Sequence, residues 1–354
     1  MNILVFGELY FNYTDSTVYA FRQLGHNVEV VYMPLLHKSK LSIKEHILYK
    51  LGNKAFLNEF YENTRNKLLN LIEDFEPDLF LSINGNQFAE YIDHNILYKL
   101  KIKGVVSAVW YLDTIKKFTA INQHLDLFDH IYSFEPDDTE WAKEQYDVTV
   151  QYLPIGVAEE LYCNNQEKIE EIYDVSFVGN FTENRAEVLD KIAEYCKANN
   201  KSLIVYGHYW HNKHWWQEAS AKKKFAKKYP NLVGYIRNEF LYGNDVTKLY
   251  LQSKICMNIH TIVHKGINPR TFEILGNGNF ELCDYRSDAE QFGLIDKHNI
   301  ALFNDADDCV KQVDYYLNNE DERKSIGKHG KETVKDKYTM TKLLGEVLED
   351  LKGR

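Results

Sequence analysis

Short apolar runs alternate along the chain with longer segments in which apolar residues recur at helical spacing. In the first half the runs are NILVFG (2–7), NVEVVYM (27–33), DLFLSIN (78–84), GVVSAVWYL (104–112), HIYSFE (130–135) and VQYLP (150–154). In the second half they are DVSFVGN (174–180), SLIVYGH (202–208), LVGYI (232–236), ICMNIH (255–260), NFELCD (279–284) and IALFN (300–304). The segments between them, such as 17–24 and 42–75, predict helices. Strands that are apolar on both faces and alternate with helices are typical of parallel sheets covered on both sides, so the pattern predicts an α/β fold.

The length of 354 residues is more than one ordinary core needs and suits two domains. The break falls after YLPIGVAEELY, where Pro154 and Gly156 interrupt the pattern and the polar stretch CNNQEKIEE follows. We therefore predict a first domain at 1–157, a linker at 158–172, a second domain at 173–337 and a C-terminal helical segment at 338–354. The helix expected over 341–351 would return to brace the first domain.

Charge and cysteine content narrow the class of protein. The formal net charge of -10 disfavours a nucleic-acid surface, because phosphate binding needs a basic face. Five scattered cysteines form no CxxC pair and no disulfide framework. The chain opens without a charged leader, and no apolar run approaches the ~20 residues that span a bilayer. These features predict a cytoplasmic protein in a reducing compartment.

Both halves open with a strand, a glycine turn and a helix. The turns contain Gly7 in the first half and Gly179 with Asn180 in the second. Glycine allows close approach of a ligand to the backbone, although glycine after a strand is common in any α/β protein. Because ligands of open parallel sheets bind at the carboxyl ends of the strands, we expect both turns to line a central cleft.

Two arginines in the second half lie near the starts of predicted helices. Arg185 follows the Gly179 turn, where the free amide groups of a helix N-terminus already favour an anion. Arg270 lies near the start of another predicted helix, and Glu273 is on the same face three residues later. This pair suits the diphosphate and the ribose of a nucleotide, or it forms an ordinary surface ion pair.

Three further stretches are candidates for a site. In GYIRNEF, the backbone around Tyr235 and Ile236 would read the edge of a base. Asp113 ends an apolar strand, where it would act as a general base on an acceptor hydroxyl or cap a helix. The stretch GHYWHNKHWW, beginning near His208, would close over a sugar or form an aromatic structural loop; three-histidine metal binding is a weaker alternative.

Basic and amphipathic segments of the sequence are compatible with contact to a membrane surface. The run AKKKFAKKYP is most simply the solvated face of a helix. Lysines at 38–67 accompany apolar residues that would pack in a core or meet a lipid-linked acceptor. Localisation on the inner face of the membrane is therefore an additional expectation.

The second half resembles the donor domain of GT-B glycosyltransferases, especially the CgeB-type spore-maturation group. The resemblance is carried by DVSFVGNFTENR, VYG, NPRTFEILGNGNFELCD and ERKSIGKHGKETV, over roughly 174–351. The first half matches more loosely, through YLDT, SFEPDDTEWAKEQY and YLPIGV. The same skeleton is similar to that of phage DNA β-glucosyltransferase.

The resemblance implies two Rossmann-like domains facing a central cleft and a nucleotide-sugar co-substrate, with a UDP-sugar favoured and neither metal nor other cofactor. It implies that Arg185 and Arg270 hold the diphosphate, that Glu273 holds the ribose and that Asp113 is the base. The expected donor-binding residues are Gly179, Asn180, Arg185, Tyr235, Ile236, Arg270, Thr271 and Glu273, and the expected cleft loops contain Gly7, His208 and Lys265.

One departure from the family pattern concerns the stereochemistry. Many retaining GT-B enzymes carry two glutamates separated by seven residues, the second matching Glu273; here the first position is Lys265. Inversion assisted by Asp113 is therefore favoured, and Lys265 would help to neutralise the leaving group. The acceptor is expected to be a glycan, a protein or a lipid-linked molecule. A nucleotide-sugar 2-epimerase and a non-catalytic nucleotide- or glycan-binding partner of a transferase are the alternatives.

Overall fold

The computed structural model describes residues 1–8, 12–33, 42–84, 91–118, 122, 124–163, 169–210, 218–262 and 266–352. The chain divides into two compact units. Unit 1 comprises Met1–Ile155 together with Leu343–Arg354, and unit 2 comprises Gly156–Lys342. None of the helices described is both long and apolar enough to cross a membrane.

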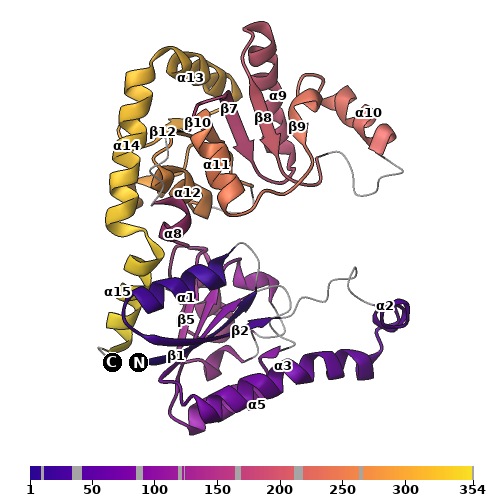
Figure 1. Ribbon diagram of the computed structural model, residues 1–354, viewed down its shortest axis with the longest axis vertical. Coiled ribbons are helices and arrows are strands. Elements are labelled where there is room, and N and C mark those ends of the chain that lie inside the picture. The colour runs from indigo at the N-terminus through magenta and orange to yellow at the C-terminus, as the bar shows by residue number, and fades with distance from the viewer. Residues whose placement is uncertain are drawn as a thin grey trace. The chain divides into compact units, whose positions relative to one another are not determined.

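Unit 1 is built on a parallel sheet, with six strands among the described residues in the order β2-β1-β3-β4-β5-β6. Figure 1 shows this sheet with β1, β2 and β5 labelled. The strands are β1 (Asn2–Glu8), β2 (Asn27–Met33), β3 (Leu79–Asn84), β4 (Val106–Tyr111), β5 (His130–Ser133) and β6 (Gln151–Tyr152). The helices are α1 (Tyr13–Gln23), α2 (Ile43–Lys50), α3 (Lys54–Asp74), α5 (His94–Ile102), α7 (Asp138–Tyr146) and α15 (Met340–Lys352). Ile3 and Leu4, on opposite faces of β1, are both fully buried, as expected for a sheet covered on both sides.

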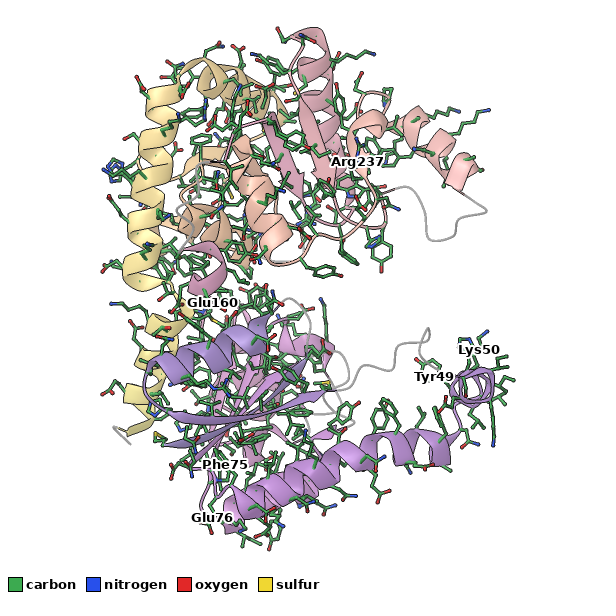
Figure 2. The ribbon with its side chains drawn as sticks, in the orientation of Figure 1. Tyr49, Lys50, Phe75, Glu76, Glu160 and Arg237 are labelled. Atoms are coloured by element: carbon green, nitrogen blue, oxygen red, sulfur yellow. The ribbon has the colours of Figure 1, made fainter. Side chains whose placement is uncertain are left out.

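The long helical pattern predicted over 42–75 is divided into α2 and α3. Gly52 adopts a positive φ of 61°, which ends the first helix. The Asn53 side chain then accepts a hydrogen bond from the amide of Phe56 and starts the second. Figure 2 shows the result, with Tyr49 beyond one end of α3 and Phe75 at the other.

Unit 2 contains a second parallel sheet, with six strands among its described residues in the order β12-β11-β10-β7-β8-β9. The strands are β7 (Tyr173–Val178), β8 (Leu203–Tyr206), β9 (Ile236–Arg237), β10 (Ser253–Asn258), β11 (Glu281–Asp284) and β12 (Ala301–Phe303). The helices are α8 (Glu159–Tyr162), α9 (Glu183–Ala198), α10 (Glu218–Lys228), α11 (Asn244–Leu251), α12 (Pro269–Asn277), α13 (Ala306–Asn318) and α14 (Glu320–Lys337).

The order of strands in unit 2 reverses between β7 and β10, which are neighbours in the sheet. The chain leaves β7 through α9 to reach β8, and leaves β10 through α12 to reach β11 on the other side. Because such crossovers are right-handed, α9 and α12 cover opposite faces of the sheet. Accordingly, α9 packs with α13, whereas α12 packs with α11 and α14. The carboxyl ends of β7 and β10 thus form a topological switch point, where open parallel sheets bind ligands.

The stretch predicted as a linker contains structure of its own. Helix α8 lies within it and packs against α11 and α12. A Cβ added to Gly276 of α12 would lie 3.2 Å from both Cys163 Sγ and Val157 Cγ2, so the helix approaches this segment closely. At the other end of the chain, residues 343–352 of α15 belong to unit 1, which confirms the predicted return of the C-terminal helix.

Candidate functional site

Arg185 lies in the first turn of α9, at the switch point. Its Nε donates to the backbone carbonyl of Ile259, just after β10, over 2.7 Å, and its guanidinium also donates to the carbonyl of Asn180 over 2.9 Å. The guanidinium carbon lies 5.5 Å from the centre of the Phe177 ring. Because these partners are neutral, they orient the guanidinium without cancelling its charge.

Two glycines make room for this arrangement. A Cβ on Gly179 would lie 2.8 Å from the Phe177 ring and 3.3 Å from the Arg185 guanidinium. Gly207, which follows β8, has a φ of 148°, and a Cβ there would lie 1.9 Å from the carbonyl oxygen of Gly179. The two turns therefore pass each other at a distance that only glycine permits.

Arg270 lies in the first turn of α12. Its guanidinium donates to the Tyr250 hydroxyl over 2.7 Å and lies 4.0 Å from a carboxylate oxygen of Glu273. The exposed fractions of the two side chains are 25% for Arg270 and 16% for Glu273, so this is a largely buried pair rather than an exposed surface one.

The positive charges of the two arginines affect each other. Burial and then the positive charge of Arg270 lower the pKa of Arg185 to about 10, against the opposing effect of Asp284. Burial likewise raises the pKa of Glu273, although Arg270 opposes the shift. Two guanidinium groups that repel each other beside two helix N-termini favour a bound anion, which would relieve the repulsion.

A buried polar network supports the start of α12. The Asn268 side chain caps the helix by accepting from the Arg270 amide over 3.0 Å. Below it, Glu281 accepts hydrogen bonds from Asn258 Nδ2 and the Thr271 hydroxyl, both over 2.9 Å. Thr271 is fully buried, so its hydroxyl braces the helix from within.

The Asn180 side chain holds the two glycine turns together. Its Oδ1 accepts from the backbone amide of His208 over 3.0 Å. The His208 ring lies edge-on to Phe240, with ring centres 3.9 Å apart. Asn180 and His208 are thus brought together beside the Arg185 turn.

Tyr235 precedes β9 and Ile236 begins it, so neither residue follows the strand. Tyr235 ends a 3-10 turn and packs against the hydrophobic core of unit 2, and Ile236 is buried. The residues after the strand begin with Asn238, whose side chain accepts from the Trp210 amide over 3.2 Å.

Asp113 and Gly7 belong to unit 1. Asp113 follows β4, and both of its carboxylate oxygens accept from Lys117 Nζ, over 2.8 and 2.7 Å. Its side chain is 38% exposed. A Cβ on Gly7 would lie 2.4 Å from the Thr14 hydroxyl, so this glycine allows α1 to approach the end of β1.

Lys265 lies outside the described residues, as do 211–217 of the aromatic and histidine stretch. Other parts of the site were missed by sequence reasoning. Tyr250, His260 and Glu281 are separated from Arg270 by ten or more residues in sequence, and no spacing rule links them to it. Among these residues of the site, the sequence indicated only Gly207, because the VYG stretch repeats the pattern of a strand followed by glycine that occurs at Gly7 and Gly179.

Known proteins resemble this chain in part of its sequence and in its fold. Residues 185–349 match the family model described as glycosyl transferase-like. Sucrose-phosphate synthase from Thermosynechococcus elongatus aligns with a TM-score of 0.65 and 10% identity, over 100% of both chains. Anabaena HepE, solved with UDP and glucose, aligns with a TM-score of 0.64 and 9% identity, also over 100% of both chains. No curated protein matches the sequence.

A third similar structure is a putative UDP-N-acetylglucosamine 2-epimerase from Listeria monocytogenes, with a TM-score of 0.58 and 11% identity over 99% of this chain and 95% of that one. At such identities the likeness concerns the fold, and the chain has the GT-B fold of two parallel-sheet α/β units. Its residues 185–349 are similar to the glycosyl transferase-like family. The closer resemblance to the CgeB-type group and to phage DNA β-glucosyltransferase stays a prediction.

Proposed function

We propose that the protein is a glycosyltransferase that moves a hexosyl or N-acetylhexosaminyl group from a nucleotide sugar, with a UDP-sugar favoured, to an acceptor hydroxyl. The observation that carries the proposal is the position of two arginines at the switch point of unit 2. Arg185 lies in the first turn of α9 and Arg270 lies in the first turn of α12. The match of residues 185–349 to the glycosyl transferase-like family and the fold shared with HepE, solved with UDP and glucose, support it.

In this proposal the diphosphate lies between the two guanidinium groups. Their charge and the amides at the start of α9 would stabilise the leaving nucleoside diphosphate. This is the task that a divalent cation performs in other transferases, so the proposed reaction needs no metal. Glu273, largely buried next to Arg270, would bind the ribose hydroxyls. The Gly179 and Gly207 turns would let the backbone approach the nucleotide, with Asn180 and His208 beside them.

Asp113 is the proposed general base. It would take the proton of the acceptor hydroxyl as the anomeric carbon is attacked, giving inversion. Lys117, which holds both carboxylate oxygens, would have to release one of them for this step. The acceptor would be a glycan, a protein or a lipid-linked molecule, reached in the cytoplasm or at the inner face of the membrane.

Nucleotide binding by unit 2 is the first test. We expect one of UDP, GDP, ADP and dTDP to raise the thermal unfolding temperature, since a ligand at 100 times its Kd adds about 2.7 kcal/mol of stability. Arg270→Ala should remove most of this shift by deleting the diphosphate contact. Arg237→Ala, which removes an exposed arginine of β9 in the same unit, is the matched control. An equal response in Arg270→Ala and the wild type would remove the proposed donor site.

Turnover distinguishes transfer from its alternatives. Incubation of the wild type with the matching nucleotide sugar, with and without acceptor pools, should release nucleoside diphosphate together with a new glycoside. Asp113→Asn should keep the thermal response to the diphosphate and lose transfer. Interconversion of the donor sugar without any acceptor would instead identify an epimerase, the activity named for the Listeria structure. Binding without turnover across the donor panel would indicate a non-catalytic partner.

A further inference from the structure

His260 is the second residue after β10, and it contacts the first turn of α9 and the residue that caps α12. Its side chain is fully buried. Its backbone carbonyl accepts from Asn184 Nδ2, in the first turn of α9, over 2.8 Å. Its ring Nε2 is paired with the backbone amide of Asn268, the cap of α12, over 3.1 Å. One residue therefore connects α9 and α12 across the switch point.

The partners of the ring define its protonation. A backbone amide can only donate, so Nε2 accepts from Asn268 and must be unprotonated. The proton then lies on Nδ1, which donates to Asp284 over 2.7 Å. Asp284 also accepts from Arg286 over 2.7 Å, which fixes the carboxylate. Burial lowers the pKa of His260 against the opposing effect of Asp284, so the ring is neutral at neutral pH.

Asn268 connects His260 to Arg270 through hydrogen bonds. Its side-chain oxygen accepts from the Arg270 amide over 3.0 Å, and its side-chain amide donates to Asn258 Oδ1 over 3.0 Å. The same side-chain oxygen also accepts from Asn258 Nδ2 over 3.0 Å. The Asn268 backbone amide is a further tether, and its acceptor is His260. A change at the imidazole therefore acts on the turn from which the Arg270 side chain extends.

The same side chains also form a group that could hold a metal ion. Ligand atoms of His260, Cys283 and Asp284 lie within 4.8 Å of one another. Both ring nitrogens of His260 are already used in hydrogen bonds, however. Burial also raises the pKa of Cys283 well above its ordinary value, which keeps the sulfur as a thiol rather than the thiolate that metals prefer. The group is better explained as a hydrogen-bonded support.

We propose that His260 is a positioning residue that sets the spacing of Arg185 and Arg270 and thereby the affinity of unit 2 for a nucleoside diphosphate. The proposal rests on the proposed function in taking that ligand. Without the Nε2 acceptor, the partly buried Asn268 amide loses its partner, and the start of α12 shifts to pair it again. The guanidinium of Arg270 moves with it, whereas Arg185 stays on the carbonyl of Ile259.

Two substitutions separate the roles of the two ring nitrogens. In His260→Asn the side-chain amide replaces Nδ1 and keeps the bond to Asp284, but no atom reaches the Asn268 amide. In His260→Gln the longer side chain places an oxygen near the position of Nε2 and restores that acceptor. His298→Asn, the same substitution at an exposed histidine of unit 2, is the matched control. UDP binding is measured by calorimetry for each variant, alone and combined with Arg270→Ala.

We expect His260→Asn to raise the Kd for UDP about tenfold, because the partly buried Asn268 amide is left without its acceptor and the turn that carries Arg270 shifts. His260→Gln and His298→Asn should stay within about threefold of the wild type. In the Arg270→Ala background, His260→Asn should add less than about twofold, because the residue through which it acts is absent.

The measurements distinguish a failure of the positioning role of His260 from a failure of the proposed donor site. If the wild type binds UDP and Arg270→Ala weakens binding, but His260→Asn binds like the wild type, the positioning role is wrong and the donor site stands. An equal tenfold loss in both backgrounds would likewise overturn it. If Arg270→Ala binds UDP like the wild type, the proposed donor site itself fails. Should thermal unfolding show that His260→Asn does not fold, His260→Gln decides: a tenfold loss there contradicts the proposal, and near wild-type affinity supports it.

Discussion

Arg185 is oriented by backbone carbonyls from two different loops, and the space around it depends on glycine. The carbonyls of Asn180 and Ile259 accept its hydrogen bonds, and the Phe177 ring lies against the guanidinium. A carboxylate in the place of these carbonyls would neutralise the charge and remove the reason for an anion to bind. The absence of a side chain at Gly179 is what allows the ring and the guanidinium to lie together.

Gly179→Ala tests this packing. The new methyl would lie 2.8 Å from the Phe177 ring, so the ring must move and disturb Arg185. We expect a loss of about 1–3 kcal/mol in the free energy of unfolding, together with weaker UDP binding. Gly234→Ala is the control, because a Cβ there meets no atom within 4 Å. Urea unfolding and calorimetry provide both measurements, and equal results for the two variants would contradict the packing argument.

At the scale of elements, α12 is supported from below by a buried carboxylate. Glu281, at the start of β11, accepts from Asn258 and Thr271, and burial raises its pKa to about 7 despite these hydrogen bonds. The folded state therefore prefers the protonated carboxyl. Its contribution to stability is complete below the ordinary pKa of 4.5 and is lost as the pH rises through about 7.

Glu281→Gln should remove this pH dependence. The amide oxygen keeps both accepted hydrogen bonds and carries no charge. Between pH 5 and pH 8 the wild type should lose up to about 3 kcal/mol of unfolding free energy that the variant retains. Urea unfolding at the two pH values measures the difference, with Glu290→Gln, at an exposed position of the same unit, as the control. A wild type and a Glu281→Gln variant with the same pH slope would show that the carboxyl does not titrate in this range.

At the scale of the whole molecule, the last helix completes unit 1. Residues 343–352 of α15 belong to that unit although they follow unit 2 in sequence. Leu344 and Leu348 are buried, and a Cβ on Gly345 would lie 3.6 Å from Leu24, at the end of α1. Unit 1 therefore depends on the far end of the chain for part of its core.

Leu344→Ala should weaken unit 1 selectively. Truncation of a buried leucine costs about 2–5 kcal/mol, whereas Glu346→Ala, at an exposed position of the same helix, should be nearly neutral. Thermal unfolding should show an earlier transition for unit 1, and the Kd of unit 2 for UDP should not change. A lower affinity for UDP in Leu344→Ala would contradict the prediction that this substitution affects unit 1 alone.

The alternation of apolar runs and helical segments predicted most of the fold. The runs in both halves became strands because a segment that is apolar on both faces is stable only inside a covered sheet. The run LVGYI is shifted: the strand begins at Ile236, and the preceding residues form a 3-10 turn. Helix α1 begins at Tyr13, four residues before the predicted start at Thr17, with Asn12 in a left-handed conformation at its cap. Local sequence signals predict whether a segment is a helix or a strand more reliably than they predict its first and last residues.

Sequence by itself determined the α/β class, the two glycine turns and the presence of an arginine near the starts of α9 and α12, because each is a property of adjacent residues. Only the tertiary structure decided that the helices carrying Arg185 and Arg270 follow adjacent strands, since that depends on β7 and β10 being neighbours in the sheet. The same holds for Tyr250 and His260, whose side chains meet Arg270 or its supporting turn through contacts between distant segments. Hydrogen bonds of this kind are set by strand order and helix packing, and no short-range pattern of the chain records them.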